Sequence, residues 1–186
     1  MDFYTPEEFK KYIEIAKQQA LKKQKEENNL YEWNFYIFFN IAYYTGLRKG
    51  EIHALRWNDI NNNYLSVKHS ITQKLTKQED VETPPKNKSS IRTIQIPLPL
   101  MKILKEYEKR QKQSYNNSED SRILGDGRCL RDTTIQKRNI LYSSLAGVKT
   151  IRIHDFRHSY ASLLANMGIN IQEVARRLGN SKVEIT

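Results

Sequence analysis

Apolar residues recur at helical spacing along most of this chain, and that spacing predicts a mostly helical protein. Thr5-Pro6-Glu7-Glu8 is a capping box with proline at the first helical position, and it predicts a helix from Pro6 to about Lys25. The stretch from about Tyr31 to Tyr44 is apolar on almost every side, which predicts a helix at the centre of the core. Further helices are predicted over 49–55, from Pro99 through Tyr107, and over 133–146, 154–167 and 171–178.

The apolar pattern changes to alternation between residues 64 and 97, as in half-buried strands. Strands are predicted over 64–68 and 91–96, with a middle strand around 71–75, whereas 59–63 is turn material. We therefore expect one small, three-stranded antiparallel sheet in an α+β fold that is mostly helical. A length of 186 residues fits a single domain over 1–186.

Composition excludes several classes of protein. No apolar run approaches the ~18 residues that a membrane-spanning helix needs. The first eleven residues are too polar for a signal peptide, and Cys129 is the only cysteine, which excludes a disulfide scaffold and a cysteine-based zinc cluster. We expect a cytoplasmic protein without a membrane partner.

The charge is strongly positive and unevenly distributed. The net charge is +10, from 31 Lys and Arg against 21 Asp and Glu. Residues 1–64 are balanced, with 9 basic and 9 acidic side chains, so the whole excess lies in 65–186. Such an excess favours a polyanionic partner, most often nucleic acid. Charge that serves only solubility is the alternative.

Two basic segments are candidates for binding a phosphate. In Thr45-Gly46-Leu47-Arg48-Lys49-Gly50-Glu51-Ile52, a glycine turn places Arg48 at a helix N-terminus, with Glu51 one turn on to orient its guanidinium. In Pro85-Lys86-Asn87-Lys88-Ser89-Ser90-Ile91-Arg92, a lysine at a hairpin tip is able to reach a bound phosphodiester. The alternatives are a surface ion pair and an edge-protecting charge run.

A third cluster, Ile153-His154-Asp155-Phe156-Arg157-His158-Ser159-Tyr160, opens an apolar-periodic helix. His154 and Arg157 are spaced to project from one face; the alternative makes His154 a helix cap and Arg157 a surface residue. Two arginines, a lysine and a histidine suit phosphoryl chemistry without a metal, because Arg binds phosphate oxygens in bidentate fashion and Lys and His move protons. The sequence contains no acidic cluster spaced for two metal ions.

These segments together resemble the catalytic domain of the tyrosine recombinase (phage integrase) family. The resemblance covers almost the whole chain, through Thr5–Phe9, Tyr44–Ile60, Pro85–Pro97, His154–Ser162 and, in part, Leu178–Ser181. It implies the catalytic-domain fold of that family. It also implies that Arg48 and Arg157 clamp the scissile phosphate of DNA.

The resemblance implies roles for other residues as well. Lys86 would be the general acid that protonates the 5′-hydroxyl leaving group, and a one-residue slip in the hairpin would give that role to Lys88. His154 would act in proton transfer, and Glu51 would support the arginine site. Asn180 stands where the family has histidine or tryptophan; an amide still donates a hydrogen bond but does not titrate near neutral pH.

The family cuts and rejoins DNA strands through a 3′-phosphotyrosyl intermediate, which implies neither ATP nor another cofactor nor an essential metal. Its nucleophile would lie beyond Thr186, so none of the 11 tyrosines is assigned that role. We expect a fragment without the core-binding domain that precedes the catalytic domain in the family, able to bind DNA but not to cleave it. The implied partners are double-stranded DNA and other recombinase protomers, as a tetramer on DNA.

Two other functions compete with this interpretation. Residues 171–182 resemble a helix-turn-helix, with alanine in the first helix and glycine at the turn, as in a transcription regulator. That alternative leaves the Arg48 and Arg157 segments without a role. A metal-dependent phosphohydrolase built on His154-Asp155 lacks a second cluster of His or Asp ligands.

Overall fold

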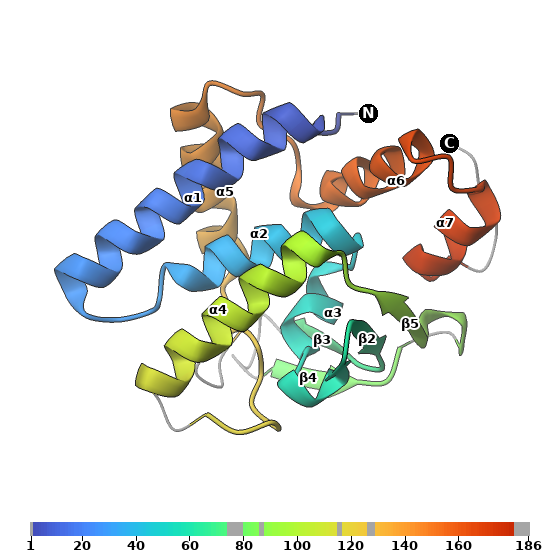
Figure 1. Ribbon diagram of the computed structural model, residues 1–186, viewed down its shortest axis with the longest axis horizontal. Coiled ribbons are helices and arrows are strands. Elements are labelled where there is room, and N and C mark those ends of the chain that lie inside the picture. Colours follow the sequence, from blue (N-terminus) through green and yellow to red (C-terminus); the bar gives the residue numbers. More distant parts are fainter. Residues whose placement is uncertain (1, 74–79, 86–87, 115–116, 126–128, 181–186) are drawn as a thin grey trace.

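The computed structural model describes residues 2–73, 80–85, 88–114, 117–125 and 129–180 (Figure 1). Within these ranges the α-helices are α1 (Pro6–Glu27), α2 (Trp33–Thr45), α3 (Lys49–Ala54), α4 (Leu98–Ser114), α5 (Asp132–Ala146), α6 (Phe156–Asn166) and α7 (Ile171–Leu178). The strands are β1 (Ile60–Asn61), β2 (Tyr64–Val67), β3 (Ser70–Gln73), β4 (Asp80–Thr83) and β5 (Arg92–Gln95). Short 3-10 turns are η1 (Trp57–Asp59), η2 (Lys88–Ser90) and η3 (Ile153–Asp155). The expected mostly helical α+β fold is confirmed.

Helix α1 begins at the predicted capping box. The Thr5 hydroxyl accepts from the backbone N–H of Glu8, and the Glu8 carboxylate accepts from the N–H of Thr5. Two of the backbone N–H groups at the helix start are therefore satisfied. The apolar stripe of α1 packs against α2 and α5, where the Tyr12 hydroxyl donates to Asn139 at 2.9 Å.

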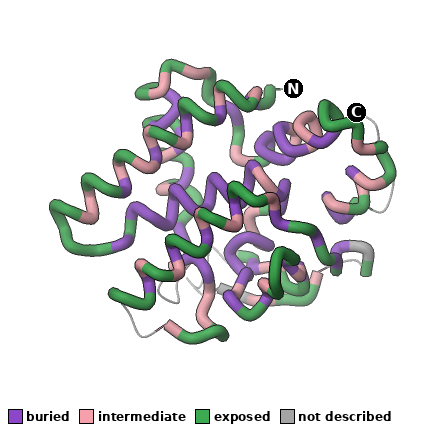
Figure 2. The backbone as a smooth tube through the Cα atoms, in the orientation of Figure 1, coloured by how far each residue is buried: buried purple, intermediate pink, exposed green. Residues whose placement is uncertain are grey.

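Helix α2 is the centre of the core, as its pattern predicts. Every residue from Trp33 to Tyr43 is buried, and Figure 2 shows the helix as an almost continuous buried segment. It contacts α1, α3, α4 and α6. A helix without a polar face is stable only when other elements surround it, and α2 meets that condition.

The three-stranded antiparallel sheet exists, but its predicted membership is wrong in one strand. The order is β1-β2-β5, so the segment Ile60–Asn61, expected as turn, is the third strand. The predicted middle strand is instead β3, which pairs with β4 in a separate two-stranded sheet. The physical reason is that β3 packs on α3: a Cβ on Gly50 would lie 2.6 Å from the Ile71 carbonyl oxygen.

The C-terminal helices lie at one end of the molecule, next to β5 (Figure 1). The helix predicted from His154 begins with the 3-10 turn η3, and α6 follows at Phe156. Val174 and Leu178 of α7 pack against Tyr160 and Leu164 of α6. Within the described ranges, no helix is long and apolar enough to cross a membrane.

Candidate functional site

Arg48 lies at the start of α3, directly after the turn that ends α2. Its backbone N–H donates to Glu51 Oε2 at 2.8 Å, and its guanidinium Nη1 donates to Oε1 at 3.3 Å. Nη2 donates to the side-chain oxygen of Asn180 at 3.3 Å. The side chain is 42% exposed, so Glu51 fixes the guanidinium from the protein side while the other side faces solvent.

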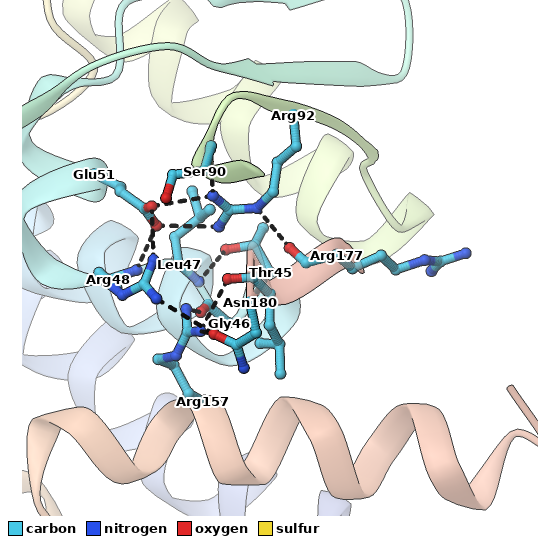
Figure 3. A network of polar contacts seen from close by, with 11 residues as sticks. Thr45, Gly46, Leu47, Arg48, Glu51, Ser90, Arg92, Arg157, Arg177 and Asn180 are labelled. Carbon is cyan, nitrogen blue, oxygen red and sulfur yellow. Dashed lines mark hydrogen bonds and ion pairs between the residues drawn. The ribbon is translucent and has the colours of Figure 1, made fainter. Parts of the chain in front are cut away.

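Arg157, in the first turn of α6, approaches the same point from a different helix. Its Nη1 donates to the Gly46 carbonyl at 2.6 Å, and its Nη2 donates to the Leu178 carbonyl at 2.9 Å and to Asn180 Oδ1 at 3.3 Å. Burial, together with the nearby charge of Arg48, lowers the pKa of Arg157 to about 10. Two guanidiniums far apart in the sequence thus meet at one amide oxygen (Figure 3).

The turn at Gly46 makes this meeting possible. Gly46 ends α2 with φ +63°, a conformation that disfavours residues with a Cβ. A Cβ there would lie 2.5 Å from Cδ1 of Tyr160 and 2.7 Å from Cδ2 of Leu178. Glycine therefore lets α6 and α7 approach the end of α2 closely enough for Arg157 to reach the Gly46 carbonyl.

Glu51 is buried, with an exposed fraction of 2%, and its carboxylate binds two arginines rather than one. Besides Arg48, it accepts from both terminal nitrogens of Arg92 at 3.0 and 3.1 Å. Burial alone would raise the pKa of Glu51, but the hydrogen bonds and charges of Arg92 and Arg48 outweigh it and lower the pKa. The carboxylate is therefore ionised at neutral pH.

Arg92 is the residue of this network to which the sequence interpretation assigned no role. Its strand shows period two, and the buried positions are 92, 94 and 96, while Ile91 is 55% exposed. The signal was present: Arg92 stands on the same face as Ile94 and Ile96, and a buried arginine needs a carboxylate partner.

The remaining predicted site residues fall into three groups. Asn180, just after α7, is brought to both arginines. His154 lies in η3, one turn before Arg157. Partial burial, followed by the charges of Arg157 and His158, lowers the pKa of His154, so its imidazole is neutral at pH 7. Lys88 opens η2 with an exposed side chain, and the described contacts do not join it to the arginines. Lys86 lies outside the described residues.

The charges around the site do not balance. The guanidiniums of Arg48 and Arg92 hydrogen-bond to the Glu51 carboxylate, and the charge of Arg157 acts on the same carboxylate without a hydrogen bond to it. The site is exposed to solvent at Arg48 and Asn180. Its excess positive charge therefore favours the binding of an anion there. In the described part of the chain, no group of three or more His, Cys, Asp or Glu side chains is placed to hold a metal ion.

Comparison with known proteins identifies relatives over the whole chain. The model of the phage integrase family matches residues 3–186. The chain is 33% identical to the ICEBs1 integrase of Bacillus subtilis (strain 168), over 100% of this chain and 49% of that protein. It is 32% identical to a XerC-like tyrosine recombinase of Caldanaerobacter subterraneus subsp. tengcongensis, over 98% of this chain and 51% of that protein. The chain thus spans about half the length of these curated relatives.

Solved structures share the fold. The XerA recombinase matches with a TM-score of 0.70 and 19% identity, over 98% of this chain and 56% of that one. The Tn1549 transposon integrase, in complex with transposon right end DNA, matches with a TM-score of 0.74 and 20% identity, over 98% of this chain and 59% of that one. These similarities confirm the expected architecture.

Proposed function

Because this chain belongs to the phage integrase family, we propose that residues 1–186 are the catalytic domain of a tyrosine recombinase that cuts and rejoins DNA at specific sites. The chain spans about half the length of its curated relatives, so the activity of a whole recombinase is part of the proposal. Two relatives at 33% and 32% identity carry the names integrase and tyrosine recombinase, which supports it. The reaction, its substrate and its partners are part of the same proposal.

One observation carries the proposal: a single acceptor atom lies 3.3 Å from the guanidiniums of both Arg48 and Arg157. That atom is the amide oxygen of Asn180. A non-bridging phosphate oxygen also accepts hydrogen bonds from the planar guanidinium of arginine, and its negative charge would strengthen both hydrogen bonds. The excess positive charge of the site supports a phosphodiester as the anion.

The proposed reaction forms a bond between a tyrosine oxygen and the phosphorus and breaks the bond from phosphorus to the 5′ oxygen. Arg48 and Arg157 stabilise the charge that develops on the non-bridging oxygens. Lys86, or Lys88 if the hairpin register is shifted, gives a proton to the departing 5′ oxygen. The neutral imidazole of His154 is suited to accept a proton, and the Asn180 amide donates to the phosphate. No tyrosine of this chain is proposed as the nucleophile.

The proposed partners are double-stranded DNA and further recombinase protomers, assembled as a tetramer on DNA in the cytoplasm. The solved Tn1549 integrase was captured with transposon right end DNA, and a lambda integrase dimer was captured on a COC′ core site. Those complexes support DNA as the partner here. The net charge of +10 supports the same partner.

A helix-turn-helix regulator is not favoured. In that alternative α7 would be the first helix of the motif and would be free to present its partner to DNA. Instead, the end of α7 is held inside the site, because the Arg177 and Leu178 carbonyls accept from Arg92 and Arg157 at 2.7 and 2.9 Å. These contacts indicate that α7 is a structural part of the phosphate site rather than one helix of a helix-turn-helix motif that recognises DNA.

A nicked suicide substrate tests the proposal in a protein that carries this domain together with a nucleophilic tyrosine. We expect a covalent protein–DNA adduct that resists denaturant and disappears with protease. Arg48→Ala and Arg157→Ala should abolish the adduct, whereas Arg176→Ala, an exposed arginine paired with Glu173, should retain it. Unchanged adduct yield in the first two variants would contradict the site.

The same substrate identifies the general acid. Lys86→Ala should slow cleavage, and a 5′-bridging sulfur should restore the rate because the thiolate leaves without needing a proton. The same rescue for Lys88→Ala, and not for Lys86→Ala, would assign the role to Lys88.

A further inference from the structure

Arg92 uses every donor-bearing nitrogen of its guanidinium inside the protein. Nη1 and Nη2 donate to the two oxygens of Glu51, Nη1 also donates to the Ser90 carbonyl at 2.9 Å, and Nε donates to the Arg177 carbonyl at 2.7 Å. Its side chain is 3% exposed. Arg92 therefore has no free face with which to touch DNA, and its charge is used wholly within the fold.

These contacts join three segments that are distant in the sequence (Figure 3). Glu51 holds Arg48, Ser90 ends the turn that Lys88 begins, and Arg177 lies three residues before Asn180. Each segment thus carries one of the predicted site residues. A single guanidinium connects all three, because Arg92 hydrogen-bonds to Glu51, to the Ser90 carbonyl and to the Arg177 carbonyl.

The charge of Arg92 also determines how much of the charge of Arg48 is available to a ligand. The Glu51 carboxylate is bound bidentately by Arg92 and more weakly, at 3.3 Å, by the guanidinium of Arg48. If Arg92 were absent, the buried carboxylate would have only Arg48 as a cationic partner. Arg48 would then be drawn toward Glu51, and its positive charge would be neutralised before an anion arrived.

Gly179 provides the space that Arg92 needs at the end of α7. Its φ is +70°, and a Cβ there would lie 2.7 Å from Nη1 of Arg92. Gly147, which ends α5, has a similar φ of +65° but nothing within 4 Å of its Cβ position. The two glycines therefore share the conformational requirement, and only Gly179 also has the close approach to Arg92.

We propose that Arg92 is a positioning residue for the phosphate site: it neutralises Glu51 so that Arg48 keeps its charge for the ligand, and it fixes the end of α7, which holds Asn180 next to the two arginines. The inference rests on the proposed function, because it presupposes that Arg48 binds a phosphate. It adds a residue that touches neither the DNA nor the reacting atoms.

A double-mutant cycle tests this in the 186-residue chain, with a fluorescein-labelled 30-base-pair duplex as the probe and anisotropy as the readout. We expect Arg92→Gln to weaken binding about as much as Arg48→Ala, by about fivefold, and to have less than a twofold effect when Arg48 is already alanine. Arg176→Gln removes the same charge from a side chain that is 54% exposed, and its smaller effect should be equal in both backgrounds. Arg92→Lys should restore binding only in part, because one ammonium keeps the charge but does not span Glu51 and the Arg177 carbonyl.

Gly179→Ala and Gly147→Ala keep the test valid even if Arg92→Gln unfolds. Both strain the backbone equally, but only Gly179→Ala should weaken binding, again with no added effect on the Arg48→Ala background. Equal effects of Gly179→Ala and Gly147→Ala, or equal effects of Arg92→Gln in the two backgrounds, would overturn the positioning role. If Arg48→Ala itself leaves binding unchanged, the proposed phosphate site falls and this inference falls with it. If Arg48→Ala weakens binding while Arg92→Gln behaves like Arg176→Gln, only the inference is wrong.

Discussion

Replacing Glu51 with alanine should be among the most destabilising single changes in this chain. The carboxylate and the Arg92 side chain are each 3% exposed and are joined by two hydrogen bonds of 3.0 and 3.1 Å. Glu51→Ala leaves the Arg92 guanidinium buried without its counter-charge. Breaking a buried ion pair in this way costs about 3–5 kcal/mol. For a chain of this length, that loss corresponds to a fall in Tm of about 6–20 °C.

The assay is thermal unfolding followed by circular dichroism, with Glu173→Gln as the control. Glu173 also accepts from two arginines, Arg176 and Arg177, but at the surface, where an ion pair contributes about 0–1 kcal/mol. We expect the control to change Tm by no more than about 4 °C. A Glu51→Ala variant with the same Tm as the control would refute the claim that the buried pair of Glu51 and Arg92 stabilises the site.

The pH dependence gives a second check with a defined sign. The pKa of Glu51 is lowered in the folded state, so its contribution to stability is fully present above the usual glutamate pKa of about 4.3. It is lost as the pH falls through the lowered folded-state pKa. The difference in unfolding free energy between the wild type and Glu51→Gln should therefore be constant near pH 7 and shrink at acidic pH. A difference that grows below pH 4 would contradict this assignment.

Two further predictions concern the turn at Gly46 and the imidazole of His154. Gly46→Ala should destabilise the fold by about 2–5 kcal/mol, because the position combines a positive φ with a contact of 2.5 Å from the new Cβ to Tyr160. Gly168→Ala is the control: with φ +77° and open space around the Cβ position, it should cost only about 1–2 kcal/mol. Equal losses of stability in thermal melts would contradict the packing argument. NMR titration should give His154 a pKa below 6.5, because of partial burial and the charge of Arg157. Duplex DNA should raise the pKa of His154 by neutralising that charge. An ordinary or elevated pKa of His154 in the free protein would contradict the electrostatics of the site.

Local signals in the sequence determined most of the helices. The capping box at Thr5 and the all-round apolar stretch of α2 predicted their elements closely, because each signal lies within the element that it specifies. The pairing of β3 was not predictable in this way. β3 pairs with β4 and packs on α3 at Gly50, and alternation along the strand encodes neither of these partners.

The site shows the same division. Arg48 at a helix start and Glu51 one turn later were predicted from spacing alone. The meeting of Arg48 with Arg157 depends on how α2, α3, α6 and α7 pack, so it came from the family resemblance rather than from local pattern. Arg92 received no role from the sequence because the argument for its segment concerned the lysines of the basic turn, although the strand phase places Arg92 on the buried face.

The central claim is that Arg48 and Arg157 bind one and the same phosphate. The most direct measurement is the salt dependence of duplex DNA binding for the wild type and the Arg48→Ala/Arg157→Ala double variant. Each phosphate contact contributes about 0.9 to the slope of log K against log salt concentration. A shared phosphate predicts that the double variant loses about 0.9 from the slope. A loss of about 1.8 would mean that the two arginines bind separate phosphates and would contradict the account.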